Sequence, residues 1–212
     1  SASPVGLTDV FATVARTVGA EAPGISLFDP PRPRRIYAES LYPRIHLGWS
    51  ELRSLVDEKH HYIEAPKPEL YDLASDPLEK SNVLASQRRV YAALRKELDA
   101  LPRGESATGR IDPEEAKKLA ALGYLSATAP SDGGPLPDPK ERIGELTTLQ
   151  RASMLVKERR YAEAIALLRS LVAANPRLTD AWSLLARTQQ YAGDLDGAIA
   201  TYRQTLSAHP HL

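Results

Sequence analysis

The chain has 212 residues, of which 42% are hydrophobic, enough for one or two folded domains with hydrophobic cores. Its 27 basic residues balance its 27 acidic residues, so no net field attracts nucleic acid or an anionic membrane. The absence of cysteine excludes a disulfide framework, a cysteine nucleophile and thiolate metal sites. No stretch approaches the roughly 20 apolar residues that span a bilayer, so we expect no membrane span.

Changes in composition divide the sequence into three parts. Residues 1–125 mix strand and helix patterns, residues 126–141 form a linker rich in proline, glycine and serine, and residues 142–212 are helical. This division predicts an α+β fold, in which a small antiparallel sheet with covering helices precedes an all-α array of helical hairpins.

The first predicted element is a short amphipathic helix near the N-terminus. Three valines at helical spacing are preceded by a capping residue and followed by a glycine stop: Val10, Val14 and Val18, with Thr8 or Asp9 before them and Gly19 after them. This spacing predicts one apolar face along the helix.

Strands are predicted next along the chain. Residues 34–42 and 51–65 carry β-branched and aromatic residues in short runs, and the second run is broken by a turn sequence at 57–59. Residues 68–73 alternate as a further strand. These segments predict a small antiparallel sheet that contains a hairpin.

Two helices are predicted after the strands. In residues 86–101, Val90, Leu94 and Leu98 line one face, which can cover the sheet. Residues 111–125 form the second helix, whose ends are marked by a cap, a first-turn proline, a capping-box glutamate and a closing glycine: Asp112, Pro113, Glu115 and Gly123.

The last part of the chain contains an internal repeat. Sliding the sequence by thirty-four residues superimposes three pairs: Ala164 and Ala198, Ile165 and Ile199, and Pro176 and Pro210. The second copy adds Trp182, Leu185, Gly193 and Tyr202, where the first copy has Thr148, Arg151, Arg159 and Leu168. The period, the small alanine where two helices cross and the closing proline resemble the tetratricopeptide repeat.

The resemblance implies two helical hairpins and a protein-interaction role. The expected helices are residues 143–157, 161–174, 179–192 and 195–208. Such an array presents a groove to a peptide or protein ligand. Because about three units are usually needed for a stable solenoid, we expect this pair to pack against a further repeat or another surface.

The stretch "ELYDLASDPLEKSNV" allows two interpretations. Asp72, Asp76 and Glu79 could gather a hard cation, but the spacing lacks the glycine and the final glutamate of a calcium loop. Alternatively, Asp76 accepts backbone donors in a turn, and Asn82 or Ser86 caps the next helix. We favour a corner of the fold and expect no metal site.

Taken with "GISLF", with "AALGYLS" and with the rest of the run "RRIYAESLYPRIHLGWSELRSLVDEKHHYIEAPKPELYDLASDPLEKSNV" that contains it, this stretch resembles the C-terminal end of the sulfatase family, in the alkaline-phosphatase-like superfamily. "ELYDLxxDPxExxN" is the most specific part of the match, and Asp9, Val10 and Thr13 match the family's last core helix, with Ala12 replacing its proline. The resemblance covers residues 5–125. Attached tetratricopeptide repeats are similar to a bacterial subgroup.

The resemblance also shows what is missing. Sulfatases carry a Cys-x-Pro-x-Arg or Ser-x-Pro-x-Arg motif, oxidised to formylglycine, and acidic calcium ligands, in their N-terminal part. In this chain Ser75-Asp76-Pro77 continues to Glu79 where arginine is required. We therefore expect a fragment without catalytic residues or cofactor of its own, whose partner is the missing N-terminal sulfatase core and whose parent binds calcium.

His46 and Trp49 are candidates for the wall of the parent's substrate cleft, where an imidazole and an indole suit a sugar or aryl sulfate. The alternative is that Trp49 packs under the sheet and His46 caps a loop. Adjacent His60 and His61 should point to opposite faces of a strand and cannot bind one ion together.

Three classes of function remain open: the non-catalytic end of a sulfatase-type hydrolase, a tetratricopeptide scaffold that binds a peptide or protein, and a purely structural part. The hydrolysed ester could be a sulfate, a phosphate or a phosphonate. The first residues lack a secretory signal. The chain is thus cytosolic or does not start at the natural N-terminus, in which case the resemblance implies a periplasmic or secreted parent.

Overall fold

The computed structural model describes residues 3–103 and 135–208. Two compact units result: Ser1–Ser40 with Leu52–Arg103, the sheet unit, and Leu41–Glu51 with Gly104–Leu212, the repeat unit. The helix predicted at 111–125, most of the predicted linker and Pro210 lie outside the described residues.

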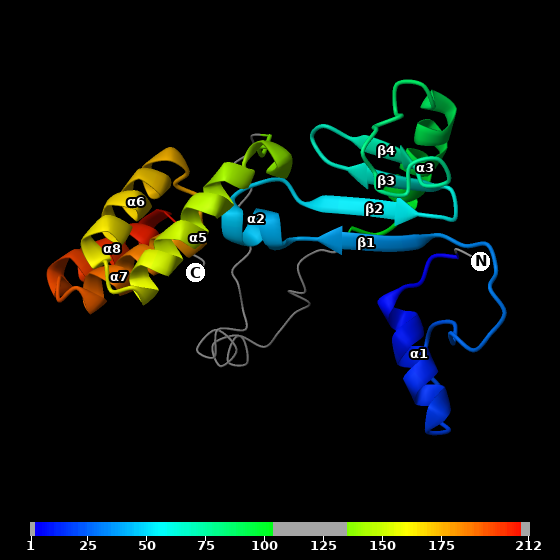
Figure 1. Ribbon diagram of the computed structural model, residues 1–212, viewed down its shortest axis with the longest axis horizontal. Helices are drawn as coiled ribbons and strands as arrows, with labels where there is room; N and C mark the ends of the chain where they lie inside the picture. The colour runs from blue at the N-terminus through cyan, green and yellow to red at the C-terminus, as the bar shows by residue number, and fades with distance from the viewer. Residues whose placement is uncertain (1–2, 104–134, 209–212) are drawn as a thin grey trace. The chain divides into compact units, whose positions relative to one another are not determined.

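The sheet unit is built on four antiparallel strands in the order β1-β2-β3-β4 (Figure 1). They are β1 (Ile36–Ser40), β2 (Leu52–Val56), β3 (His60–Glu64) and β4 (Glu69–Asp72). The predicted hairpin between β2 and β3 is confirmed, and the Asp57 carboxylate closes its turn by accepting bonds from the amides of Lys59 (2.9 Å) and His60 (2.8 Å).

Helix α3 (Arg88–Ala100) packs on the sheet, as the apolar spacing predicts. Its buried Leu94 and Leu98 form a cluster with Leu55, Tyr62 and Leu70 from three strands. The alternation of apolar residues along each strand places all three on the same face. This cluster is the core of the sheet unit.

The N-terminal helix α1 (Leu7–Thr17) is amphipathic, but its large apolar side chains face solvent and its buried face carries small and acidic residues. It buries Asp9, Ala12 and Ala15 and leaves its large apolar side chains exposed: Leu7 is 90% exposed, and Val10, Phe11, Val14 and Val18 are also on the surface. The predicted apolar face therefore exists but has no partner among the described residues.

The buried Asp9 holds the N-terminal segments together. Its carboxylate accepts bonds from the Arg34 guanidinium (3.0 Å) and from the backbone amides of Gly6 (2.6 Å) and Ile25 (2.9 Å). The Arg34 guanidinium, helped by these amides, keeps the pKa of the Asp9 carboxyl well below its usual range. Asp9 is thus a structural anion.

The repeat unit contains two helical hairpins with the predicted helices. These are α5 (Ile143–Lys157), α6 (Tyr161–Ala174), α7 (Thr179–Tyr191) and α8 (Leu195–Ala208), preceded by the short 3-10 helix η1 (Pro139–Glu141) (Figure 1). Each span agrees with the sequence prediction within one residue. The fold is α+β, as predicted, with an all-α array at the C-terminal end.

Both hairpins turn through a left-handed residue at equivalent positions. Arg159 follows α5 with φ 61°, and thirty-four residues later Gly193 follows α7 with φ 83°. Only glycine adopts this conformation without steric cost. The first copy therefore keeps the turn of the repeat while lacking its favoured residue.

Candidate protein-interaction surface

The chain between β1 and β2 belongs to the repeat unit, although sequence analysis assigned it to the sheet part. Residues 41–51 form a short helix, α2 (Tyr42–Leu47), which ends at Gly48 in a left-handed conformation with φ 68°. A side chain at Gly48 would lie 2.3 Å from the Cβ of Arg177. Glycine is therefore required for this segment to approach the loop between α6 and α7.

Trp49 lies in the core of the repeats. Its side chain is 1% exposed, in a cluster with Leu47 and with Ala152, Leu168 and Trp182 of the repeat helices. The indole N–H donates to the Glu145 carboxylate of α5 at 3.2 Å. The expected places for Trp49, a cleft wall or the underside of the sheet, are both wrong.

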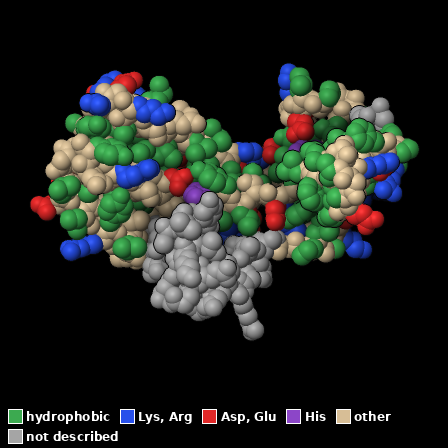
Figure 2. Space-filling view, turned by 90° about the horizontal axis from the view of Figure 1, so that it is seen from below, with side chains coloured by type: hydrophobic (Ala, Val, Ile, Leu, Met, Phe, Trp, Pro, Cys, Tyr) green, Lys and Arg blue, Asp and Glu red, His purple; other side chains and the backbone are tan. Residues whose placement is uncertain are grey.

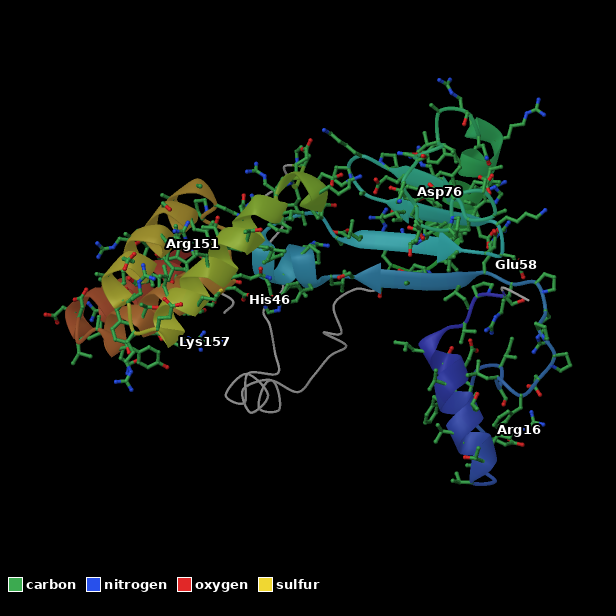
Figure 3. All side chains as sticks on the ribbon, viewed as in Figure 1. Arg16, His46, Glu58, Asp76, Arg151 and Lys157 are labelled. Carbon is green, nitrogen blue, oxygen red and sulfur yellow. The ribbon has the colours of Figure 1, made fainter. Side chains whose placement is uncertain are left out.

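His46 also faces the repeats; Figure 3 labels it on α2. Its Nδ1 lies 3.0 Å from the Asp180 carboxylate at the start of α7, which also accepts a bond from the Tyr42 hydroxyl at 2.9 Å. The rings of Tyr42 and His46 stack with centroids 4.5 Å apart. His46 is half-buried and engaged by these contacts with α7. Its expected place in the parent's cleft stays a prediction.

Side chains of the repeats satisfy the last carbonyl groups of α2. Asn175 donates to the Leu47 carbonyl at 2.9 Å and to the Glu145 carboxylate at 2.7 Å, and the Thr179 hydroxyl donates to the His46 carbonyl at 3.1 Å. A short helix leaves these carbonyls without partners of its own. The repeat unit therefore binds α2 as an internal ligand, through both apolar and polar contacts.

A groove of about 470 Å³ runs between α6, α7 and α8. Trp182 and Leu185, both almost fully buried, contribute apolar surface to it, and Arg169 and Gln204 contribute exposed polar groups. The remaining lining residues are Val172, Ala173, Pro176, Gln189, Gly197, Ala200 and Thr201. The groove thus combines an apolar surface with a cation, a chemistry that suits a polypeptide segment.

The polar groups at the base of the groove are fixed by internal bonds. The Trp182 indole N–H donates to the Pro176 carbonyl at 2.9 Å, and the Thr201 hydroxyl donates to the Gln189 side-chain oxygen at 2.7 Å. Because these bonds pre-set the side-chain positions, a ligand would lose little conformational entropy by ordering them.

The predicted repeat residues divide into packing and surface positions. Ala164 is fully buried and Ala198 is 4% exposed, as expected where helices cross, while Pro176 and Trp182 line the groove. Tyr202, in contrast, is 42% exposed on α8.

The residues of the Asp-Pro motif make local bonds in the sheet unit; Figure 3 labels Asp76 in the turn after β4. Asp76 accepts from the Ser81 amide at 2.7 Å, and Asp72 from the Ala74 amide at 3.1 Å. The Asn82 side-chain oxygen accepts from the amides of Leu70 (3.1 Å) and Leu84 (3.0 Å). These bonds suit the turn interpretation, but the expected helix cap is wrong: α3 follows Gln87, and no side chain caps it.

Glu79 makes a contact that the sequence did not suggest. It has a left-handed backbone with φ 53°, and its carboxylate lies 3.0 Å from Nδ1 of His61. His60 instead contacts the Gln87 side-chain oxygen at 3.1 Å. Across residues 3–103 and 135–208, no three histidine or carboxylate side chains gather in a way that could hold a metal ion.

Charged side chains of both signs lie on the face drawn in Figure 2. On the face drawn in Figure 2, basic and acidic side chains are interspersed, and neither sign forms a continuous patch. In the described part of the chain, no helix has the length and apolar character needed to cross a membrane.

Comparison with known proteins identifies the helical array. Residues 155–211 match the tetratricopeptide repeat family, which confirms the repeat predicted from the sequence. No curated protein matches the chain. The repeats indicate a protein-interaction module, and the match covers α6, α7 and α8, the three helices that line the groove.

Proposed function

We propose that the repeat unit binds a segment of a partner protein in the groove between α6, α7 and α8. The observation that carries the proposal is the groove itself, where Trp182 and Leu185 offer apolar surface beside the exposed Arg169. The fitting ligand is a short segment with apolar side chains and a carboxylate placed to meet the guanidinium.

Peptides selected from a displayed random library against the intact chain test this proposal. We expect the selected peptides to carry apolar residues beside an acidic one. Ala200→Glu, which puts a charge into the groove, should weaken them about tenfold or more, because a desolvated charge disrupts an apolar contact.

The internal repeat offers a matched control. Arg203 occupies on α8 the position of Arg169 on α6, is exposed and lies outside the groove. Arg169→Glu should therefore weaken the peptides, and Arg203→Glu should leave their affinity unchanged. Equal losses for the two changes, or full binding by the Ala200→Glu chain, would contradict the groove as the site.

The sheet unit supports a second proposal, that the chain is the C-terminal part of a sulfatase-type hydrolase. The supporting observation is α1, which exposes Leu7, Val10 and Val14 while burying Asp9. A helix with this pattern needs a partner surface. The family resemblance implies that this surface is the N-terminal core, which would also provide the nucleophile and the calcium ligands.

The expected outcome for the chain alone is no saturable hydrolysis of nitrophenyl sulfate or nitrophenyl phosphate, with or without calcium. The upstream gene sequence gives the sharper test. An open reading frame that lacks the formylglycine motif over several hundred residues upstream would overturn the sulfatase proposal without affecting the groove.

The exposed face of α1 gives a test on the protein itself. We expect the chain to bind a hydrophobic dye and to associate at high concentration, and the double change Leu7→Lys with Val14→Lys to reduce both. Lys157→Gln, on α5 of the repeat unit, is an exposed control and should alter neither. A strictly monomeric wild-type chain without dye binding would count against a missing core.

A further inference from the structure

Helix α8 carries an exposed apolar stripe that the groove does not use. The stripe consists of Leu195, Ile199, Tyr202 and Leu206, which are 59%, 49%, 42% and 54% exposed. Their spacing places them on one helix face. The groove residues of α8, such as Ala200 and Gln204, lie about half a turn away, so the α8 stripe is a separate surface.

The internal repeat shows what such a stripe does. Shifted by thirty-four residues, the α8 stripe becomes Tyr161, Ile165, Leu168 and Val172 of α6. Leu168 is fully buried, Val172 is 6% exposed, and both belong to a cluster with α7. The same helix face is therefore covered in the first copy and uncovered in the second.

The α7 residues of that cluster show which helix fits. They are Ala181, Trp182 and Leu185, a small residue, an aromatic residue beside it and a leucine one turn later. The small residue lets two helix backbones approach, and the larger side chains fill the space beside it. A helix with this pattern can contact the α8 stripe as α7 contacts α6.

We propose that the α8 stripe is the docking site for an amphipathic helix of this pattern, presented by a partner polypeptide. The site continues the α6–α7 interface by one repeat, so its geometry is already set by the array. It is a second binding surface, independent of the groove.

A second copy of this chain offers no such helix among the described residues. In α7 the pattern is already buried, and α5 exposes only Ile143 and Met154 as large apolar side chains. Helix α1 exposes bulky side chains but buries its small residues, Ala12 and Ala15, in the sheet unit. Among the described helices of a second copy, α1, α5 and α7 therefore do not present this pattern on an exposed face.

The test uses a labelled peptide of residues 178–194, the segment that covers α6, titrated against the intact chain. Because a free peptide of this length is barely helical, a side-chain lactam joins positions 183 and 187, which are both exposed on α7. We expect saturable binding in fluorescence anisotropy. A matched peptide with Trp182→Ser and Leu185→Ser should not bind.

Variants of the chain locate the site. Ile199→Glu with Tyr202→Glu should weaken the peptide about tenfold or more, since charges would then face an apolar helix. Ala200→Glu, in the groove, should leave the affinity unchanged, so that failure of one surface is distinguishable from failure of the other. Leu206→Lys alone provides a milder second variant, and circular dichroism checks that each variant is folded.

Three outcomes would overturn the proposal: no binding at millimolar peptide, equal binding by the stripe variants, or self-association of the chain that the stripe variants abolish. The last outcome would assign the stripe to a second copy.

Discussion

The two copies of the repeat show that agreement with the family pattern and burial do not go together: the copy that departs from the pattern is well buried, and the copy that follows it exposes apolar side chains. The first copy departs from the family pattern, with Thr148 where the second has Trp182, yet its buried side chains form one cluster with Leu47 and Trp49 of the 41–51 segment and with α7. The second copy follows the pattern, yet its last helix exposes Tyr202 and Leu206. Burial in a repeat array thus depends on neighbours, more than on how closely a copy matches the pattern.

Trp49 explains how the degenerate copy is stabilised. It belongs to α2's segment, and its buried indole joins the cluster that surrounds Leu168 and Ala152. The first copy, which has Thr148 in place of tryptophan, therefore obtains a buried tryptophan from outside the array.

Removing Trp49 should have the largest effect. Trp49→Ala should lower the free energy of unfolding of the repeat unit by about 3 to 5 kcal/mol, as large-to-small changes of buried aromatic residues do. Hydrogen exchange should accelerate in α5 and α6, although the changed residue lies nearly a hundred positions away in sequence. Trp49→Phe is the milder control.

Faster hydrogen exchange in the sheet unit alone would contradict the assignment of Trp49 to the core of the first repeat copy. If Trp49→Ala accelerated exchange in residues 52–72 and left α5 protected, Trp49 would belong to the sheet after all.

The crossing alanines should give the next largest effect. Ala164→Leu overpacks a fully buried site between α5 and α6 and should cost about 1 to 3 kcal/mol. Ala198→Leu changes the equivalent site between α7 and α8 and should cost less, because α8 is free to move outward on its uncovered side.

Hydrogen exchange separates these cases. Ala198→Leu should accelerate exchange in residues 179–208 and leave residues 36–72 protected. Loss of protection across both regions would mean that the sheet and the repeats unfold as one cooperative unit. An equal cost for the two alanine changes would show that the exposed face of α8 does not loosen the last hairpin.

The repeat helices were predictable because their signals are local. The spacing of apolar residues and the alanine–proline register fix the span of each helix, and the hairpin of β2 and β3 follows from alternation and a turn around Asp57. The packing of α3 follows from the apolar face containing Leu94 and Leu98. These features need only the neighbouring sequence.

The binding of α2 to the repeats was not predictable in the same way. His46 and Asp180 are separated by more than a hundred residues, and no periodicity links them. The nearest available signal was Gly48 beside Trp49, a glycine that allows close backbone approach next to a large apolar side chain. The reversed burial of α1 was likewise hidden, because spacing identifies an apolar face without showing what covers it.

The smallest predicted effect concerns the two left-handed turns, which form a matched pair. Arg159→Gly should stabilise the first hairpin by about 1 kcal/mol, because a left-handed backbone costs an ordinary residue roughly that much. Gly193→Ala should destabilise the second hairpin by a similar amount. No atom lies within 4 Å of a side chain built at Gly193, so this change tests backbone strain alone.

Urea unfolding of both variants measures the two changes in the free energy of unfolding. A destabilising Arg159→Gly would show that the Arg159 side chain stabilises the hairpin by more than its left-handed backbone costs. Shifts of opposite sign would show that the two copies share one turn geometry, and that the first copy departs from the pattern in sequence while keeping its backbone.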